Sequence, residues 1–251
     1  MSTPRLLVLP PSHYCEKAAW ALDRAGIAYT REPHAPPFHR PPIRRAGGKG
    51  TTPTLLADGR AIDDSTAILQ WVQAQPAARW APYPAPVAAQ ALAWEERFDD
   101  EIGPHSRRFA YFHLLPHKAL TAPLLTAGVA PWQATAVRLF YPLLRWAFRK
   151  GLRIDAAGAA RSREKVLQAF DAVAAARADG RPFLTGDTFT AADLTFAALA
   201  APVVLAPIYL RTLPPLDTLP APVQASVAAF RAHPAGAWAL HLYATERSPA
   251  P

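Results

Sequence analysis

Residues 6–22 read LLVLPPSHYCEKAAWAL, which is an apolar run, a short turn and an alanine-rich stretch in direct succession. The apolar run is typical of a buried strand, and the alanine-rich stretch is typical of a helix. The turn therefore lies at a helix N-terminus, where unpaired N–H groups and the helix dipole favour a negative charge such as a thiolate. Cys15 is the only cysteine of the chain, and Ser12 stands where the second thiol of a redox pair would be. We interpret the turn as a site that holds the sulfur of another molecule.

Strand and helix signals alternate through about the first 75 residues. The predicted elements are, in order, a strand over 5–9, a helix over 14–25, a strand over 27–32, a hairpin over 54–62 and a helix with Ser65 as its N-cap. Gly26 suits the position that follows a helix C-terminus, and Asp58-Gly59 is a preferred hairpin turn. The segment 33–50 is rich in proline and arginine and predicts an irregular loop around one short helix.

Beyond this unit the strand signal disappears. The segment 76–86 carries four prolines among small residues and is typical of a linker. We therefore predict two domains, residues 1–77 and residues 87–251, the second of which is all-helical. The predicted helices of the second domain cover 88–102, 131–150, 161–177, 191–205 and 221–232.

Residues 189–194 show the pattern of a helix N-terminus. Thr190 followed by Asp193 has the outline of a capping box, and Phe189 can pack on Leu194 as a hydrophobic staple. We predict a buried helix here and a structural role for Asp193.

The chain has 251 residues and a net charge of +8, from 27 Lys and Arg against 19 Asp and Glu. Its densest basic stretch, 138–153, is interpreted as a helix with one solvated face and one core face, with a membrane- or phosphate-binding helix as the alternative. We expect no nucleic-acid partner. No apolar run approaches the roughly 18 residues of a membrane span, and the first residues are too weakly apolar for a secretory signal. We expect a cytoplasmic protein with no integral membrane association.

Four motifs stand in a familiar order: Ser12-x-x-Cys15-x-Lys17, then TPTL at 52–55, DDSTAI at 63–68, and FLTGDTFTAAD at 183–193. Together they resemble the cytosolic glutathione transferase superfamily, as a bacterial-type member with a serine- or cysteine-type turn. The resemblance implies an α/β plus all-α fold, in which a thioredoxin-like domain precedes an all-helical bundle. It also implies a homodimer. The eight histidines and the single cysteine indicate no metal site.

The resemblance implies a set of glutathione-binding residues. Thr52-Pro53 matches the family's cis-proline pair, whose backbone bonds the cysteinyl part as an added strand would; a trans turn is the alternative. Asp64 and Ser65 match the acidic-serine pair that binds the γ-glutamyl end, although Ser65 could be only a helix cap. The basic residue that often binds the glycine carboxylate is replaced by Thr51. Lys49 is our first candidate for that contact, ahead of Arg44, Arg45 and His39.

Three residues compete for the glutathione sulfur. Ser12 aligns with the position that contacts the sulfur in serine- and cysteine-type members, and its hydroxyl could raise the thiolate fraction. Tyr14 could instead donate a phenolic hydrogen bond, and Cys15 could form a mixed disulfide or be a small buried hydrophobe. His13 stands where many relatives have proline; we predict an exposed turn residue, with an acid–base role as the alternative.

The function indicated is a glutathione transferase that conjugates the glutathione thiolate to a hydrophobic electrophile, as in detoxification. Glutathione is the co-substrate, and the second domain contributes an apolar pocket. The candidate pocket residues are Trp94, Phe98, Phe109, Tyr111 and Phe112. Two alternatives stay open: a thiol–disulfide or deglutathionylating enzyme that uses Cys15, and a non-catalytic protein that binds glutathione or another ligand.

Overall fold

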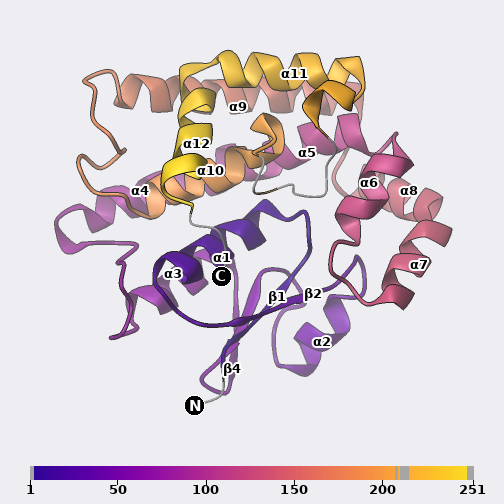
Figure 1. The fold of residues 1–251 in the computed structure, drawn as a ribbon, viewed down its shortest axis with the longest axis horizontal. Helices are drawn as coiled ribbons and strands as arrows, with labels where there is room; N and C mark the ends of the chain where they lie inside the picture. The colour runs from indigo at the N-terminus through magenta and orange to yellow at the C-terminus, as the bar shows by residue number, and fades with distance from the viewer. Residues whose placement is uncertain (1–2, 207–208, 210–214, 248–251) are drawn as a thin grey trace.

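The computed structural model describes residues 3–206, 209 and 215–247 (Figure 1). The elements of its first part are β1 (Arg5–Val8), α1 (His13–Arg24), β2 (Thr30–Pro33), α2 (Arg40–Arg45), β3 (Thr54–Ala57), β4 (Arg60–Asp63) and α3 (Ser65–Gln73). The strands form one sheet in the order β2-β1-β3-β4, with β1 parallel to β2 and antiparallel to β3. This βαβαββα unit is the thioredoxin-like arrangement that was predicted.

The local rules explain where these elements begin and end. Leu6, Leu7 and Val8 are all buried because β1 lies inside the sheet, with strands on both sides. Gly26 follows α1 with a φ of +68°, which glycine adopts at little cost. The helix α3 begins at Ser65, so the prediction that Ser65 is the N-cap was wrong by one residue: the N-cap is Asp64, whose carboxylate accepts from the Thr66 N–H at 2.9 Å.

The second part is entirely helical in the described residues. It comprises the α-helices α4 (Ala88–Glu101), α5 (Gly103–Leu114), α6 (Lys118–Leu125), α7 (Pro131–Leu139), α8 (Tyr141–Gly151), α9 (Ala156–Ala176), α10 (Ala191–Val204), α11 (Ala221–Ala232) and α12 (Pro234–Thr245), with short 3-10 turns at η1 (Ala85–Val87) and η2 (Leu216–Thr218). The fold class is therefore as predicted. In Figure 1 these helices lie above the sheet unit, and α6, α7 and α8 form the right-hand edge.

Several boundaries differ from the prediction. The helices α5, α6 and α12 were not predicted. Helix α6 has Pro123 in its interior, and α5 and α12 contain glycine, and both features lower the intrinsic helix propensity. The single helix predicted over 131–150 is two helices that meet at Phe140, and Pro142 stands in the first turn of the second. Proline lacks the N–H that a continuous helix needs there.

The helix α10 is the centre of the molecule, since every one of its residues is buried. It packs against α4, α5 and α12 of its own part and against α1 of the sheet unit, so one core spans both parts of the chain. The predicted capping box at its start is confirmed. The Asp193 carboxylate accepts from the backbone N–H of Thr190 at 2.8 Å and from that of Leu184 at 2.8 Å.

The Thr190→Ala variant is expected to lose about 1–2 kcal/mol of unfolding free energy, because the first turn of a buried helix loses its side-chain cap. Chemical denaturation followed by circular dichroism measures this loss. Thr188→Ala is the matched control, since Thr188 is exposed two residues away, and its change should stay within about 0.5 kcal/mol. Equal effects of the two substitutions would contradict the capping role.

Candidate functional site

Ser12 caps the helix that follows the first strand. It is the N-cap of α1, and its Oγ accepts from the Cys15 N–H at 3.3 Å. A serine hydroxyl can donate its one proton while it accepts this bond, and a hydrogen bond with Ser12 also acts to lower the pKa of the Cys15 thiol. Ser12 is half-buried, and its neighbours Pro11 and His13 both line a pocket. The turn that carries Ser12 therefore adjoins that pocket.

The Thr52-Pro53 segment lies beside this turn. The peptide bond between the two residues is cis, as predicted. Hydrogen bonds with the side chains of Ser12 and Thr52 both act to lower the pKa of the Cys15 thiol. Both residues therefore lie close to Cys15. The Asp64 N–H donates to the Pro53 carbonyl at 3.3 Å, which brings the start of α3 to the same place.

Asp64 and Ser65 occupy an unusual corner of the backbone. Asp64 is exposed and has a φ of +83°, a left-handed value that a non-glycine residue seldom adopts, whereas Ser65 is buried directly after it. Such outliers concentrate at functional sites because a fixed backbone direction is needed there. Here the corner leaves the Asp64 side chain outside and turns Ser65 inward at a helix N-terminus.

Lys49 lies in the loop between α2 and β3 and is exposed. Its backbone N–H donates to Asp63 Oδ2 at 2.7 Å, which fixes the loop just before Thr52. Among the other candidate cations, Arg44 packs beside Gly50, and burial lowers the pKa of His39 to about 4, so His39 is neutral at neutral pH. A loop lysine is thus available near the cis-proline, whereas His39 carries no charge to offer an anion.

Cys15 is fully buried. Burial raises the pKa of its thiol, although hydrogen bonds with Ser12, Leu9 and Thr52 oppose that shift. A reactive cysteine needs a lowered pKa and access to solvent. The surroundings of Cys15 are those of a small core residue.

Tyr14 points away from the turn. Its hydroxyl donates to the Asp99 carbonyl at 3.1 Å, at the end of α4. The tyrosine also packs on Gly103 so closely that a Cβ there would lie 1.9 Å from the hydroxyl oxygen. The Tyr14 side chain therefore fills the junction between α4 and α5, and its proton is already donated.

His13 is buried, so the prediction of an exposed turn histidine was wrong. Its Nε2 lies 2.9 Å from the Gly103 carbonyl oxygen, and the helix junction covers the ring. Burial, with smaller contributions from Arg107 and Lys17, lowers its pKa to about 3. At neutral pH the ring is therefore neutral, and its Nε2–H donates to Gly103.

The buried His13 makes stability sensitive to acid. Since the unfolded histidine takes up its proton near pH 6.5 and the folded one only near pH 3, unfolding free energy falls as pH falls through this window. His13 alone should cost about 2–3 kcal/mol at pH 4.5 relative to pH 7. Urea denaturation of the wild type and His13→Gln at both pH values measures this difference. His241→Gln, at an exposed histidine, is the control, and its unfolding free energy should depend on pH as that of the wild type does.

A small, largely apolar pocket of about 30 Å³ opens next to the Ser12 turn. It is lined by Pro11, His13, Arg107, Ala110, Tyr111, Leu114, Thr121, Leu124, Leu125, Pro202 and Tyr209. The Tyr209 hydroxyl donates to the Pro11 carbonyl, so the second part of the chain also holds the turn itself. Of the residues expected here, Tyr111 lines this pocket and Phe109 lines a neighbouring one, while Phe98 is buried in the core against Phe196.

Arg107 was missed by the sequence reasoning. Its guanidinium lines the pocket, and within the described residues its buried Nε has no hydrogen-bond partner. No local pattern distinguishes it from the adjacent Arg108, which bonds to the Leu152 carbonyl. Only the packing of α5 over the turn places one of the two arginines in the pocket.

A buried ion network behind the turn was also missed. We call it the Lys17 network, made of Lys17, Thr66, Glu95 and Asp99. The Lys17 ammonium is fully buried and lies 2.7 Å from Glu95 Oε1 and 2.8 Å from Asp99 Oδ2, and the Thr66 hydroxyl bonds both carboxylates. Burial raises the pKa of Asp99, against the opposing effect of Lys17. The network joins α1 and α3 to α4, so it fixes the two helix starts that carry Ser12 and Ser65.

His113 and His117 stand four residues apart, a spacing that the expectation of no metal site overlooked. In the part of the chain that the structure describes, however, no group of three or more His, Cys, Asp and Glu side chains is placed to hold a metal ion. None of the described helices combines the length and the apolarity that crossing a bilayer requires.

Two family models match the chain. Residues 6–80 match the model described as glutathione S-transferase, N-terminal domain, and residues 156–235 match the one described as glutathione S-transferase, C-terminal domain. The first range contains the Ser12 turn, the cis-proline and the Asp64 corner. No curated protein matches the chain.

Solved structures extend the likeness to the whole chain. A glutathione S-transferase of Ceriporiopsis subvermispora in complex with glutathione has a TM-score of 0.67 and 19% identity, over 99% of each chain. Another from the same organism, also with glutathione, has a TM-score of 0.62 and 15% identity, over 99% of this chain and 100% of the other. One from Xanthobacter autotrophicus Py2 has a TM-score of 0.57 and 20% identity, over 93% and 95%. At these identities the likeness concerns the fold.

Proposed function

The chain belongs to the glutathione S-transferase superfamily, and from this premise we propose that it binds glutathione and transfers the glutathione sulfur to a hydrophobic electrophile. The observation that carries the proposal is the position of Ser12. Its hydroxyl caps α1 at a helix N-terminus, between Pro11 and His13, which both line the apolar pocket. A free thiol with a pKa near 8.5 is mostly protonated at neutral pH, so a hydrogen bond to its thiolate at a helix N-terminus raises the reactive fraction.

The rest of the tripeptide is assigned to residues around the turn. The Thr52 backbone receives the cysteinyl part, and the exposed Asp64 carboxylate pairs with the α-ammonium of the γ-glutamyl part. Ser65 and the free N–H groups of α3 bind the α-carboxylate, because a helix N-terminus favours an anion. Lys49 binds the glycine carboxylate. Solved relatives with glutathione bound support this use of the fold.

The pocket beside His13 and Arg107 is assigned to the electrophile. Its lining is mainly aliphatic and aromatic, which favours a hydrophobic substrate. The thiolate electron pair forms the new S–C bond, the leaving group departs with its own electron pair, and the thiol proton passes to solvent. Arg107 lines the same pocket, and its positive charge would favour an anion there.

The alternative of a thiol–disulfide or deglutathionylating enzyme requires an accessible Cys15. Full burial and a raised pKa both count against an attacking thiolate at this position. The structure contains no observation that favours that function over conjugation. Cytoplasmic location and a role in detoxification are part of the proposal.

Titration calorimetry with glutathione tests the binding step, and ultraviolet absorbance of bound thiolate across pH tests its activation. We expect saturable heat, a thiol pKa below the free value, and turnover of an aryl halide or an epoxide. Absence of binding heat would refute the proposal. Heat without turnover of any electrophile would make the chain a non-catalytic binding protein. Light scattering tests the homodimer expected from the family.

A further inference from the structure

The positive charge of this protein is concentrated in one segment. Residues 102–154 contain eight of the 27 Lys and Arg residues and no Asp or Glu, so the 19 remaining basic residues balance the 19 acidic ones. The net charge of +8 is therefore equal to the charge of residues 102–154, which comprise α5–α8 and the turn after α8. Five of these cations, Arg138, Arg145, Arg149, Lys150 and Arg153, lie on or next to α7 and α8.

The same two helices carry the exposed large hydrophobic side chains of the described residues. These are Trp132, Leu139, Phe140, Leu143 and Trp146, with exposed fractions between 58% and 69%. Single exposed hydrophobics are ordinary, but five on two short consecutive helices mark an interaction surface. We call these five residues and the five cations the α7–α8 face.

The helix α8 has two apolar faces. Tyr141, Leu144 and Phe148 form the inner face and pack on the rest of the protein. Leu143 and Trp146 lie three residues apart on the outer face, and Lys150 continues it with its ammonium 5.2 Å from the Trp146 ring. The helix thus has one core face and one solvent-exposed face, as expected, but the exposed face is apolar and flanked by cations. This combination is typical of helices that lie in a membrane interface.

We propose that the α7–α8 face docks the protein on the surface of a bilayer that contains anionic lipids. Tryptophan, leucine and phenylalanine side chains enter the boundary between headgroups and acyl chains, while long basic side chains reach the phosphates. The association is peripheral and does not depend on glutathione.

Charge and side-chain chemistry select this partner over two others. A second copy seated on the same face would bring five cations against five cations, which is unfavourable where apolar groups exclude water. A nucleic acid would use the cations and the aromatic rings, but it offers no partner for the aliphatic Leu139 and Leu143. An anionic bilayer satisfies the cations, the aromatic rings and the aliphatic chains together.

The first test is sedimentation of the full chain with vesicles of phosphatidylcholine and phosphatidylglycerol in equal parts, against vesicles of phosphatidylcholine alone. Binding to the anionic vesicles is expected, with strong weakening between about 0.1 M and about 1 M salt, where the Debye length falls from about 10 Å to about 3 Å. Equal binding to neutral vesicles, or no binding to either, would overturn the proposal.

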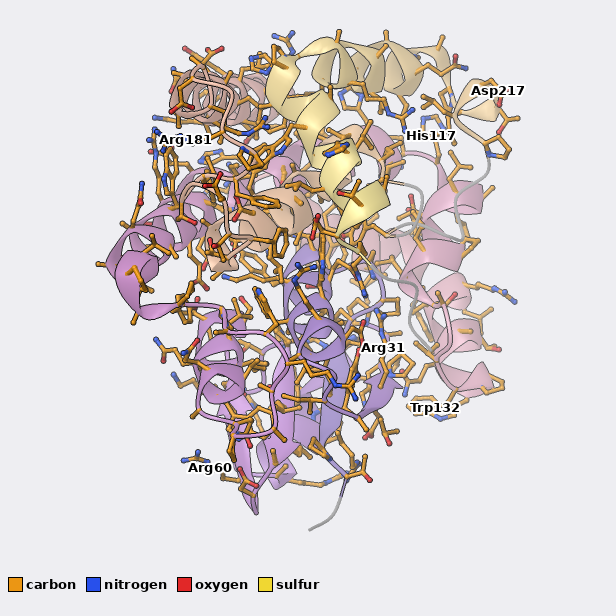
Figure 2. The ribbon with its side chains drawn as sticks, turned by 60° about the vertical axis from the view of Figure 1, so that its left-hand side comes forward. Arg31, Arg60, His117, Trp132, Arg181 and Asp217 are labelled. Carbon is orange, nitrogen blue, oxygen red and sulfur yellow. The ribbon has the colours of Figure 1, made fainter. Side chains whose placement is uncertain are left out.

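Variants locate the surface. Arg145→Gln, Arg149→Gln and Lys150→Gln combined should weaken the partition to anionic vesicles about 100-fold, and Leu143→Ser with Trp146→Ser at least about tenfold. The charge-matched control combines Arg60→Gln, Arg163→Gln and Lys165→Gln, all at exposed residues away from the face, and should retain most binding. Figure 2 shows Arg60 and Trp132 on opposite sides of the view.

The same variants distinguish an anionic bilayer from a second copy of the chain and from a nucleic acid. If light scattering showed that the Leu143→Ser, Trp146→Ser variant dissociates a dimer without changing vesicle binding, the face would belong to a second copy and the proposal would fail. Tight binding of single-stranded RNA with no vesicle binding would likewise replace it. Circular dichroism of each variant checks that the fold is kept, as expected for exposed positions.

Discussion

Ser12→Ala is expected to lower kcat/KM for glutathione conjugation by roughly 10- to 150-fold. A hydrogen bond to a charged group contributes about 1.5–3 kcal/mol, and this one acts on the thiolate and not on the neutral thiol. The apparent pKa of the kcat/KM profile should therefore rise by about 1–2 units. The measurement is kcat/KM against pH with an aryl halide, combined with the ultraviolet absorbance of the bound thiolate.

Three controls separate this effect from loss of the helix cap. Ser12→Thr keeps both a hydroxyl and a cap, so it should restore most of the activity and the wild-type pH profile. Thr190→Ala removes a cap elsewhere and should lower stability while leaving the profile unchanged. Cys15→Ser tests the competing thiol. If it abolished turnover while Ser12→Ala did not, the assignment of the sulfur contact to Ser12 would be wrong.

Lys17→Met is expected to lower the unfolding free energy by about 3–5 kcal/mol, which is a large part of the stability of an ordinary domain. The methionine fills much of the same volume, but it leaves the fully buried Glu95 carboxylate and the neighbouring Asp99 without their cation. This loss of unfolding free energy should become smaller as pH falls. Without Lys17 the folded carboxylates hold their protons more tightly than the unfolded ones, so acid favours the folded variant relative to its state at neutral pH.

A matched control for this variant lies on α4, the helix that carries Glu95 and Asp99. Arg97 and Glu101 form an ion pair of α4 with 42% and 39% of their side chains exposed, and Arg97→Met should change stability by less than about 1 kcal/mol. A triple variant with Lys17→Met, Glu95→Gln and Asp99→Asn removes the stranded charges and should be more stable than Lys17→Met alone. Urea denaturation of the four proteins at two pH values is the measurement. Similar losses for Lys17→Met and Arg97→Met would contradict the buried network.

Some of the candidate site could be predicted because its logic is local. The start of α1 after the Ser12 turn follows from the apolar run and the alanine-rich stretch on either side of it, and the α10 capping box depends on Thr190 and Asp193. The Asp58-Gly59 hairpin likewise depends on two adjacent residues. In each case the residues that decide the local structure lie within a few positions of one another. A short sequence pattern is therefore enough to predict that structure.

Other parts of the site depend on partners far along the chain. Tyr14 and His13 look like turn residues in the sequence, but both are covered by the α4–α5 junction, 85 and 90 residues away. Lys17 belongs to the Ser12-x-x-Cys15-x-Lys17 motif, but the sequence assigned it no role. The carboxylates that it pairs with lie on α4, and Asp99 is 82 residues away. Short-range rules contain nothing about which distant helix will cover a given side chain.

The sequence by itself determined the order of strands and helices in the first part of the chain, the helical nature of the second, and the position of the Ser12 turn at a helix N-terminus. Only the tertiary structure decided that Tyr14 is turned away, that Cys15 and His13 are buried, that Arg107 enters the pocket and that α8 leaves an apolar face outside. The physical reason is the distance along the chain over which each effect acts. Backbone propensity and capping act within a few residues, whereas burial, pKa shifts and unpartnered surface arise only when distant helices pack together.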